Sequence, residues 1–219
     1  MTNKRTMANN KFTEIYALLQ KHFGPQGWWP GDSPFEVMVG AVLTQNTNWE
    51  NVRKAISNLK EADALSFSRL STLSVGEIAQ LIQPSGYFNL KAQRLQNLLR
   101  MIIDRYNGKL ELFLEEDLPI AREALLSVKG IGPETADSIL LYAANHPIFV
   151  VDAYTHRIFS RHNLAAEESD YYTLQEAFHD KLPVQASLYN EYHALIVALG
   201  KEFCRKKNPQ CEQCPLQGV

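Results

Sequence analysis

The chain has 219 residues, of which 45% are hydrophobic, and its formal net charge at pH 7 is -2. This length is enough for one good hydrophobic core or two small ones, and no apolar run reaches the roughly 18 residues that would favour a membrane span. The charge excludes a globally basic nucleic-acid-binding surface. DNA binding would therefore depend on local basic clusters, such as Arg205, Lys206 and Lys207, or Lys91 with Arg94.

Apolar residues follow helical spacing along almost the whole chain. The first helix ends at Gly24 and Pro25, and the second begins at Ser33 and Pro34, an acceptor side chain ahead of a first-turn proline. We predict helices over residues 12–23, 34–47, 48–60, 66–73, 74–82, 89–106, 119–128, 133–145, 153–161, 170–182 and 186–203. The one candidate strand, "IFVVD", is too short to build a sheet. The sequence predicts an all-α fold.

The stretch "LLSVKGIGPETADSILLYA" places Gly130 and Gly132 between the end of one predicted helix and the start of another. Glycines there allow positive φ and close approach of a ligand to the backbone. Successive N–H groups at a helix N-terminus bind anionic oxygens, and a nucleic-acid phosphate is the obvious candidate. The alternative is that Gly130 caps the first helix and Gly132 permits packing. A dinucleotide-binding fold is disfavoured because no strand precedes the turn and the third glycine is missing.

Four features occur in a fixed order: "LTQNT", the glycine turn, "VVDAYTHRIFSR" and a cysteine-rich tail. Together they resemble the helix-hairpin-helix DNA glycosylase superfamily that includes endonuclease III. The resemblance covers the chain from about residue 34 to residue 214. It implies a two-lobed all-α glycosylase fold with a C-terminal cysteine-ligated cluster loop. The central helical bundle would be residues 30–146, ending in the hairpin at about 121–145. The second lobe would combine residues 1–29 with 147–219 and hold the cluster loop at 204–219.

The resemblance also implies roles for individual residues. Backbone N–H groups of Gly130, Ile131 and Gly132 would grip phosphate, and Gln45 would fill the space left by a nucleotide swung out of the duplex. Asp152 would stabilise the positive charge that develops on the sugar and activate the attacking water. Taken alone, Gln45 is a polar residue at a helix end and Asp152 is a helix N-cap; for Asp152 both roles can coexist.

The chemistry differs from that of relatives that also nick the strand. Those members have a hairpin lysine that forms a Schiff base with the sugar, whereas the matching residue here is Glu134, which we assign to the base pocket. A carboxylate cannot form an imine, so we expect base removal without that lyase activity. Lys129 is a weak substitute on the other side of the turn. Gly40 matches the position of the catalytic glutamate of adenine-mismatch members, which argues against that branch.

The stretch "GWWPGDSPFE", together with "LTQNTNW" and "PSGYFNLKAQRL", is similar to endonuclease III-type 3-methyladenine DNA glycosylases. The resemblance implies that Trp29 and Pro30 stack on the extruded base beside Trp28, and that Trp49 wedges into the duplex. Aromatic faces attract cationic rings, and alkylated bases carry positive charge. Lys201 would lie close to the pocket or to DNA. The alternatives are core or lobe-seam packing for Trp28 and Trp29, and a solvated helix end for Lys201.

The three cysteines, Cys204, Cys211 and Cys214, are separated by six and two residues. In the family this spacing suits a four-iron, four-sulfur cluster with a structural role, whose fourth cysteine is expected at position 220. The sequence stops at Val219, so either the fourth ligand lies one residue further on or the site has three protein ligands. Zinc is the alternative metal for this site. Histidines scattered over separate predicted helices are expected to pack within those helices and not to form a metal site; they are His156, His162, His179 and His193.

The resulting prediction is a monofunctional DNA glycosylase of base excision repair, acting on a flipped-out alkylated base such as 3-methyladenine in double-stranded DNA. The alternatives are a uracil or thymine mismatch glycosylase, another damaged-base glycosylase of the same superfamily, or a non-catalytic helix-hairpin-helix DNA-binding protein. We expect a monomer with no membrane association. Because Met1 to Asn10 does not resemble a signal peptide, we expect a cytoplasmic, nucleoid-associated protein of a bacterium or archaeon.

Overall fold

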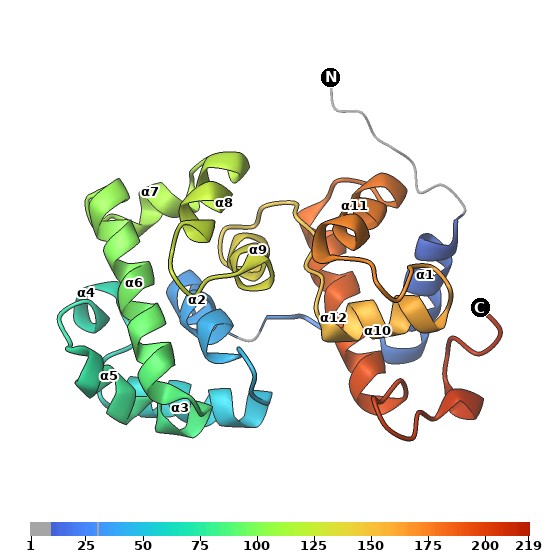
Figure 1. Ribbon diagram of the computed structural model, residues 1–219, viewed down its shortest axis with the longest axis horizontal. Helices are drawn as coiled ribbons and strands as arrows, with labels where there is room; N and C mark the ends of the chain where they lie inside the picture. Colours follow the sequence, from blue (N-terminus) through green and yellow to red (C-terminus); the bar gives the residue numbers. More distant parts are fainter. Residues whose placement is uncertain (1–9, 30) are drawn as a thin grey trace. The chain divides into compact units, whose positions relative to one another are not determined.

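The computed structural model describes residues 10–29 and 31–219, and the regular secondary structure of these residues is entirely helical (Figure 1). The chain forms two compact units. Unit 1 comprises Met1–Trp29 and Pro147–Val219, and unit 2 comprises Pro30–His146. The all-α prediction is confirmed for the described residues.

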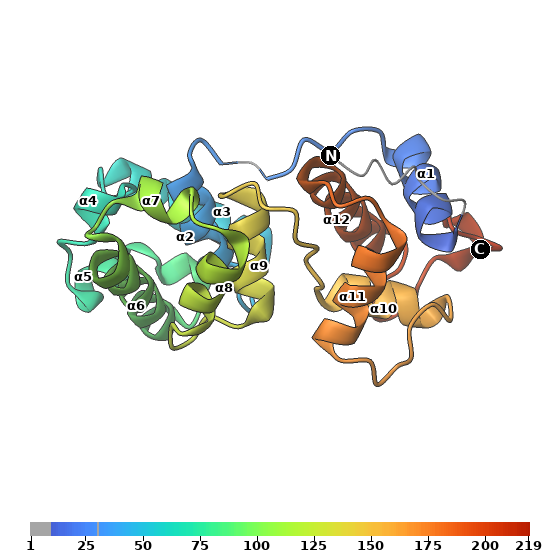
Figure 2. The ribbon, with the colours of Figure 1, turned by 90° about the horizontal axis from the view of Figure 1, so that it is seen from above.

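Unit 2 is built around a helix that is buried on all sides. Its helices are α2 Pro34–Leu43, α3 Trp49–Glu61, α4 Phe67–Leu70, α5 Val75–Leu81, α6 Phe88–Tyr106, α7 Leu110–Leu114, α8 Leu118–Leu126 and α9 Pro133–Tyr142, with a 3-10 turn, η1, at Gln83–Ser85 (Figure 2). Every residue of α2 from Phe35 to Leu43 is buried, as expected for a helix that is almost entirely apolar; its one charged residue, Glu36, pairs with Lys60 at 2.9 Å. It packs against α9, α6 and α3.

The start of α2 follows the sequence prediction and its end does not. Ser33 is the N-cap, its hydroxyl accepts from the Glu36 N–H at 3.2 Å, and Pro34 opens the helix. The helix stops at Leu43, and the predicted extension to residue 47 is a turn in which the Thr47 N–H donates to the Thr44 carbonyl at 3.2 Å. Gln45 therefore lies on a short loop, residues 44–47, which we call the Gln45 loop.

Unit 1 consists of α1 Lys11–Phe23, α10 Ala153–Arg161, α11 Tyr171–Lys181, α12 Ala186–Glu202 and the 3-10 turn η2 Cys211–Gln213 (Figure 1). The long helix α12 contacts both α1 and α10. Aromatic rings from distant parts of the chain meet in the core: Phe149 stacks on Phe178 with centroids 3.7 Å apart, and Phe12 meets Phe178 edge-on at 4.9 Å. The Tyr192 hydroxyl donates to the Phe12 carbonyl at 2.8 Å. These contacts attach the N-terminal helix to the C-terminal half of the chain.

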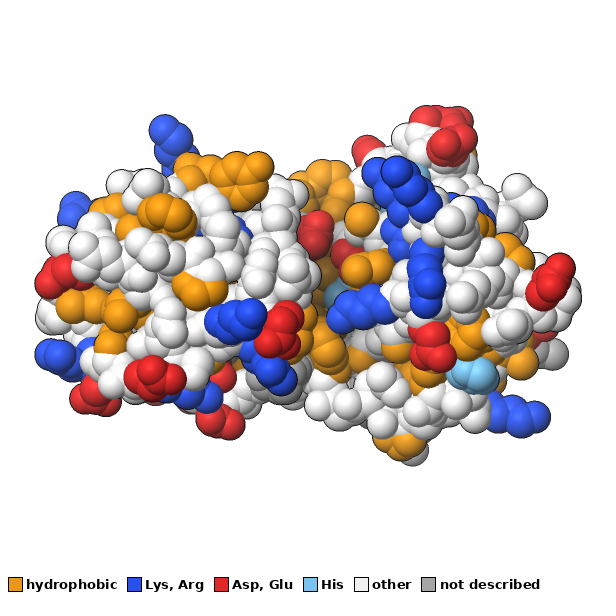
Figure 3. Space-filling view, turned by 90° about the horizontal axis from the view of Figure 1, so that it is seen from below, with side chains coloured by type: hydrophobic (Ala, Val, Ile, Leu, Met, Phe, Trp, Pro, Cys, Tyr) orange, Lys and Arg blue, Asp and Glu red, His pale blue; other side chains and the backbone are white. Residues whose placement is uncertain are grey.

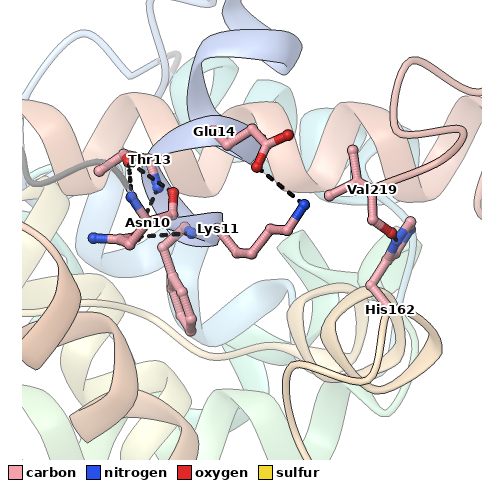
Figure 4. A network of polar contacts seen from close by, with 7 residues as sticks. Asn10, Lys11, Thr13, Glu14, His162 and Val219 are labelled. Carbon is pink, nitrogen blue, oxygen red and sulfur yellow. Dashed lines mark hydrogen bonds and ion pairs between the residues drawn. The ribbon is translucent and has the colours of Figure 1, made fainter.

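Helix α1 begins with a reciprocal cap (Figure 4). The Asn10 side chain accepts from the Phe12 and Thr13 N–H groups at 2.9 and 3.1 Å, and the Asn10 N–H donates to the Thr13 hydroxyl at 3.1 Å. A cap of this kind satisfies backbone donors that an α-helix leaves without partners at its start. The Asn10 amide also donates to the Lys181 carbonyl at the end of α11, which ties the two helices together.

The candidate strand, residues 148–152, does not form a strand, although residues 148–151 are buried. Side chains of α11 take the place of a neighbouring strand: the Phe149 N–H donates to His179 Nε2 at 3.0 Å, and Gln175 Nε2 donates to the Phe149 carbonyl at 2.6 Å. Because a buried backbone needs hydrogen-bond partners of some kind, this segment runs extended into Asp152 without a sheet.

Among the helices of the described residues, none is long and apolar enough to cross a bilayer. Figure 3 shows several Lys and Arg side chains gathered on the face of unit 1 that it presents.

Candidate functional site

The Asp152 carboxylate is fixed at the start of α10. Asp152 is the N-cap of this helix, and its Oδ1 accepts from the Thr155 N–H at 2.7 Å and from the Thr155 hydroxyl at 2.9 Å. Its side chain keeps 12% of its surface exposed, so it is not sealed in the core. The predicted N-cap role is present, and it leaves Oδ2 to face other groups.

The second carboxylate oxygen faces His193. His193 Nε2 lies 3.5 Å from Asp152 Oδ2, and the histidine side chain is 7% exposed. Burial works to raise the pKa of the Asp152 carboxyl, but His193 and the two Thr155 donors outweigh burial, so this pKa is lowered from its ordinary value. Asp152 is therefore ionised at neutral pH. The sequence prediction of His193 as a helix-packing histidine missed this contact.

Lys201 and the tryptophan pair lie in the same unit. The Lys201 ammonium is 5.6 Å from the centroid of the Trp28 ring, close enough for a cation–π contact, and the half-buried Trp28 and Trp29 rings meet edge-on at 5.6 Å. Burial lowers the pKa of Lys201, and the negative charge of Asp152 partly opposes this effect. Unit 1 thus brings an anion, a cation and an aromatic face together. Pro30, predicted to stack on the base, lies outside the described residues.

The glycine turn joins α8 to α9 within unit 2. Gly130 has φ of 98°, which favours glycine, whereas Gly132 is the N-cap of α9 with φ of -97°, so positive φ occurs at only one of the two predicted positions. The Ile131 N–H donates to the Val128 carbonyl at 3.0 Å, and the Ile131 side chain is buried. The Ile131 N–H is therefore engaged within the turn, and of the three N–H groups predicted to bind phosphate only those of the exposed Gly130 and Gly132 remain candidates.

Gln45 lies against this turn. Its Nε2 donates to the Gly130 carbonyl at 3.1 Å and to the Thr135 hydroxyl at 2.9 Å, and its Oε1 accepts from the Arg94 guanidinium. All of these groups belong to unit 2. The contact with the turn was not predicted, and nothing in the local sequence around Gln45 signals it.

The prediction that Lys91 and Arg94 form an accessible basic cluster for DNA binding is wrong. Lys91 is 1% exposed, and its ammonium donates to the Leu43 and Ser85 carbonyls at 2.7 Å each. Burial and the nearby Arg94 charge lower the pKa of Lys91 to about 8. Both basic groups are engaged inside unit 2, so neither is a solvated side chain waiting for phosphate.

The remaining predicted unit 2 residues occupy helix starts. Trp49 is the first residue of α3 and is half-buried, while the exposed Glu134 lies in the first turn of α9, directly after the glycine turn. An acid in a first helical turn is favoured by the helix dipole. Lys129, the weak substitute for the missing lysine, is exposed on the α8 side of the turn.

The cysteine loop is held by two arginines of α10. Arg157 Nε donates to the Cys204 carbonyl at 2.9 Å, and Arg161 donates to Cys204 Sγ at 3.3 Å and to the Arg205 carbonyl at 2.8 Å. These arginines were not predicted as site residues. Helix α10 therefore carries Asp152 at its start and contacts the first cysteine from its later turns.

The three thiols are near one another without forming an assembled metal site. Burial raises the pKa of the Cys214 thiol, and the charges of Cys204 and Cys211 act in the same direction. No group of three or more His, Cys, Asp or Glu among the residues that the structure describes is arranged to hold a metal ion. The donor chemistry nevertheless fits a thiolate-ligated centre, because three cysteines within electrostatic reach of each other lie on one loop.

Comparisons with known proteins identify the family. Residues 39–183 match the HhH-GPD superfamily base excision DNA repair protein family. A Methanocaldococcus jannaschii protein with the provisional name DNA repair glycosylase MJ1434 is 46% identical over 96% of this chain and 97% of its own length. Endonuclease III of Thermotoga maritima is 30% identical over 84% of this chain and 81% of its own length.

A solved structure is similar as well. The H. pylori 3-methyladenine DNA glycosylase MagIII, bound to 1,N6-ethenoadenine, aligns with a TM-score of 0.73 and 34% identity, covering 87% of this chain and 96% of its own. The sequence resemblance to this superfamily is thus confirmed by the family match, by the relatives and by the fold. This chain belongs to the HhH-GPD superfamily of base excision DNA repair proteins.

Proposed function

We propose that this protein is a monofunctional DNA glycosylase that hydrolyses the N-glycosidic bond of an alkylated base, with 3-methyladenine as the representative substrate. The observation that carries the proposal is the ionised, immobilised Asp152 carboxylate in the same unit as Trp28 and Lys201. Similarity to a 3-methyladenine DNA glycosylase supports the choice of substrate class.

In this proposal Asp152 acts through its charge and its position. As the bond from sugar to base breaks, positive charge develops on the sugar, and a fixed carboxylate stabilises it without having to reorganise. The Oδ1 atom is held by Thr155, so Oδ2 remains to orient the attacking water and accept its proton. His193, 3.5 Å from Oδ2, restricts the carboxylate further.

The tryptophan pair provides the recognition chemistry. A ring that carries positive charge is attracted to an aromatic face, so Trp28 and Trp29 suit an alkylated base better than a neutral one. Lys201 beside Trp28 brings a competing positive charge; burial lowers the pKa of Lys201, and the negative charge of Asp152 opposes that effect. Alkylation also labilises the glycosidic bond, so modest catalytic assistance is sufficient.

The absence of lyase activity follows from Glu134. Its carboxylate occupies the first turn of α9, where strand-nicking relatives are expected to have an amine, and a carboxylate forms no imine with an abasic sugar. We expect that borohydride reduction of the protein on damaged DNA yields no covalent adduct. A trapped adduct would refute this part of the proposal, and Lys129→Ala and Lys201→Ala would then identify the amine.

Asp152→Asn tests the catalytic role. We expect base release from methylated DNA to fall by about 10²-fold, the lower end of the range typical of general acid–base groups because the alkylated bond is labile, while DNA binding is retained. Asp170 offers a matched control: it is also an N-cap, it accepts from the Thr173 N–H at 2.8 Å, and no catalytic role is proposed for it. Asp170→Asn should keep full activity.

The substrate is tested with the wild-type protein. Release of 3-methyladenine without release of uracil or thymine from mismatches supports the proposal. Preferential release of a mismatched pyrimidine would replace it with the mismatch glycosylase, and no base release from any substrate would leave a DNA-binding protein.

We also propose that Cys204, Cys211 and Cys214 hold a four-iron, four-sulfur cluster with a structural role. Hydrolysis of a glycosidic bond moves no electrons, so the cluster would order the loop that contains the exposed Lys206 and Lys207. Iron and sulfide should co-purify with the wild-type protein and be lost in Cys204→Ser. Stoichiometric zinc without iron would refute this assignment.

A further inference from the structure

One side of α6 carries the two residues of the rejected basic cluster, and its side chains contact other parts of unit 2. Lys91, Arg94 and Asn97 are spaced three residues apart on α6, so they are neighbours on one side of the helix. Their side chains reach, in chain order, the end of α2, the Gln45 loop and the glycine turn. We propose that this side of α6 positions the DNA-contacting parts of unit 2, with Arg94 holding Gln45 against the glycine turn. The inference rests on the proposed DNA glycosylase function.

Arg94 is the centre of the arrangement. Its guanidinium donates to Gln45 Oε1, and its aliphatic stem crosses the bare face of Gly130. A Cβ atom on Gly130 would lie 2.5 to 2.9 Å from the Cγ, Nε and Cδ atoms of Arg94. The glycine is thus required by the arginine as well as by its positive φ. Asn97, one turn later, donates to the Lys129 carbonyl at 3.0 Å and holds the other side of the turn.

The Gln45 amide is fully used in this arrangement. Both donor contacts of Nε2 reach the turn and the start of α9, and Oε1 is held by Arg94. Because Arg94 accepts no hydrogen bond, it selects the amide orientation in which Oε1 faces α6 and Nε2 faces Gly130. The Gln45 side chain is therefore held against the glycine turn, and it could enter a duplex only by breaking these contacts.

Lys91 fixes the base of the Gln45 loop. Leu43 is the last residue of α2, and a cation at a helix C-terminus is stabilised by the exposed carbonyls and the helix dipole. The second acceptor, the Ser85 carbonyl, joins the same ammonium to η1. With the loop fixed at its base by Lys91 and at Gln45 by Arg94, the loop and the turn keep one relative placement within unit 2.

The positioning role is tested first without DNA. The Ile131 N–H, bonded to the Val128 carbonyl inside the turn, reports on the turn, and the Leu140 N–H in α9 reports on the helix. In Arg94→Ala we expect Ile131 to exchange its amide hydrogen about tenfold faster, the loss expected for about one net hydrogen bond, while Leu140 changes little. Arg94→Lys keeps the stem and the charge but not the planar fork, so it should recover part of the protection.

The functional link is tested with DNA in an Asp152→Asn background, using a duplex with an abasic-site analogue. We expect Arg94→Ala to weaken binding about tenfold when Gln45 is present, and to have less than about threefold effect when Gln45 is already alanine, because coupled residues are not additive. Arg100→Ala is the charge control: Arg100 is exposed on α6, and the described structure gives it no hydrogen bond or ion pair. It should bind like the parent protein.

Either of two results would overturn the positioning role even in an active glycosylase. One is that the Ile131 amide hydrogen exchanges at an unchanged rate in Arg94→Ala. The other is that Arg94→Ala weakens DNA binding by the same factor whether residue 45 is glutamine or alanine. Weakening by Arg100→Ala equal to that by Arg94→Ala would also overturn it, since the effect would then be one of charge. If the parent protein binds no DNA and releases no base, the proposed function fails. The Ile131 measurement still decides in that case whether Arg94 holds the turn.

Discussion

The two helices of the hairpin are joined by an ion pair whose loss should be costly. Asp137 of α9 is 0% exposed, and Arg122 of α8 donates to both of its oxygens, from Nε at 2.7 Å and from a terminal nitrogen at 3.1 Å. Removing one partner of a buried pair leaves the other charge poorly compensated, which costs roughly 3–5 kcal/mol. Arg122 is 22% exposed and can gain some hydration, so we expect Asp137→Ala to lower the free energy of unfolding by about 3 kcal/mol.

Urea unfolding followed by far-UV circular dichroism measures this loss. The adjacent residue supplies the control: Glu123 pairs with Arg105 at 3.7 Å, with side chains 77% and 42% exposed, and such surface pairs contribute less than about 1 kcal/mol. A double change, Arg122→Met with Asp137→Leu, should recover most of the stability by removing both charges. Equal costs for Asp137→Ala and Glu123→Ala would refute the reasoning.

Three further predictions follow from single contacts. A Cβ atom on Gly200 would overlap the Tyr154 ring and lie 3.1 Å from its Cβ, so Gly200→Ala should cost about 1–3 kcal/mol. A Cβ atom on Gly76 would meet only Ser74 Oγ, at 4.0 Å, so Gly76→Ala should change stability by less than about 1 kcal/mol in the same urea assay. The folded-state pKa of Asp152 is lowered, so the ionised carboxylate stabilises the folded protein. The difference in free energy of unfolding between wild type and Asp152→Asn should be constant above pH 3.8, the ordinary pKa, and should shrink as the pH falls below it, as measured by unfolding at a series of acid pH values. Lys91→Met, at a buried lysine, should weaken DNA binding without changing its salt dependence. Lys206→Ala, at an exposed lysine of the predicted basic cluster, should reduce the slope of log affinity against log salt by about one.

The helices could be predicted because their signals are local. Helix α10 has the predicted bounds, Ala153–Arg161, since an aspartate N-cap precedes an amphipathic stretch. Helix α7 was not predicted: it has only five residues, too few to show a period. The segment at 148–152 has strand-like composition, but the backbone groups of Phe149 are satisfied by His179 and Gln175 of α11, a contact that the local sequence does not signal.

The candidate site was predictable only where a residue's role depends on its own neighbours in sequence. The cap at Asp152 and the turn at Gly130 meet that condition. His193 does not, because its contact with Asp152 depends on how α12 packs against α10. A buried histidine and a solvated one look the same in a helical pattern, so no local signal could have separated them.

The basic residues illustrate the same limit in physical terms. A lysine in an amphipathic helix is usually solvated, since burying an unpaired ammonium is very unfavourable. Lys91 is the exception because two carbonyls compensate it, and both come from other segments of the chain. Arg94, Arg157 and Arg161 are likewise engaged by protein oxygens, so a count of basic residues overstates what is available to bind phosphate. In a chain of net charge -2, we therefore expect the proposed phosphate contacts of backbone N–H groups at the glycine turn to matter more for DNA binding than a count of basic residues suggests.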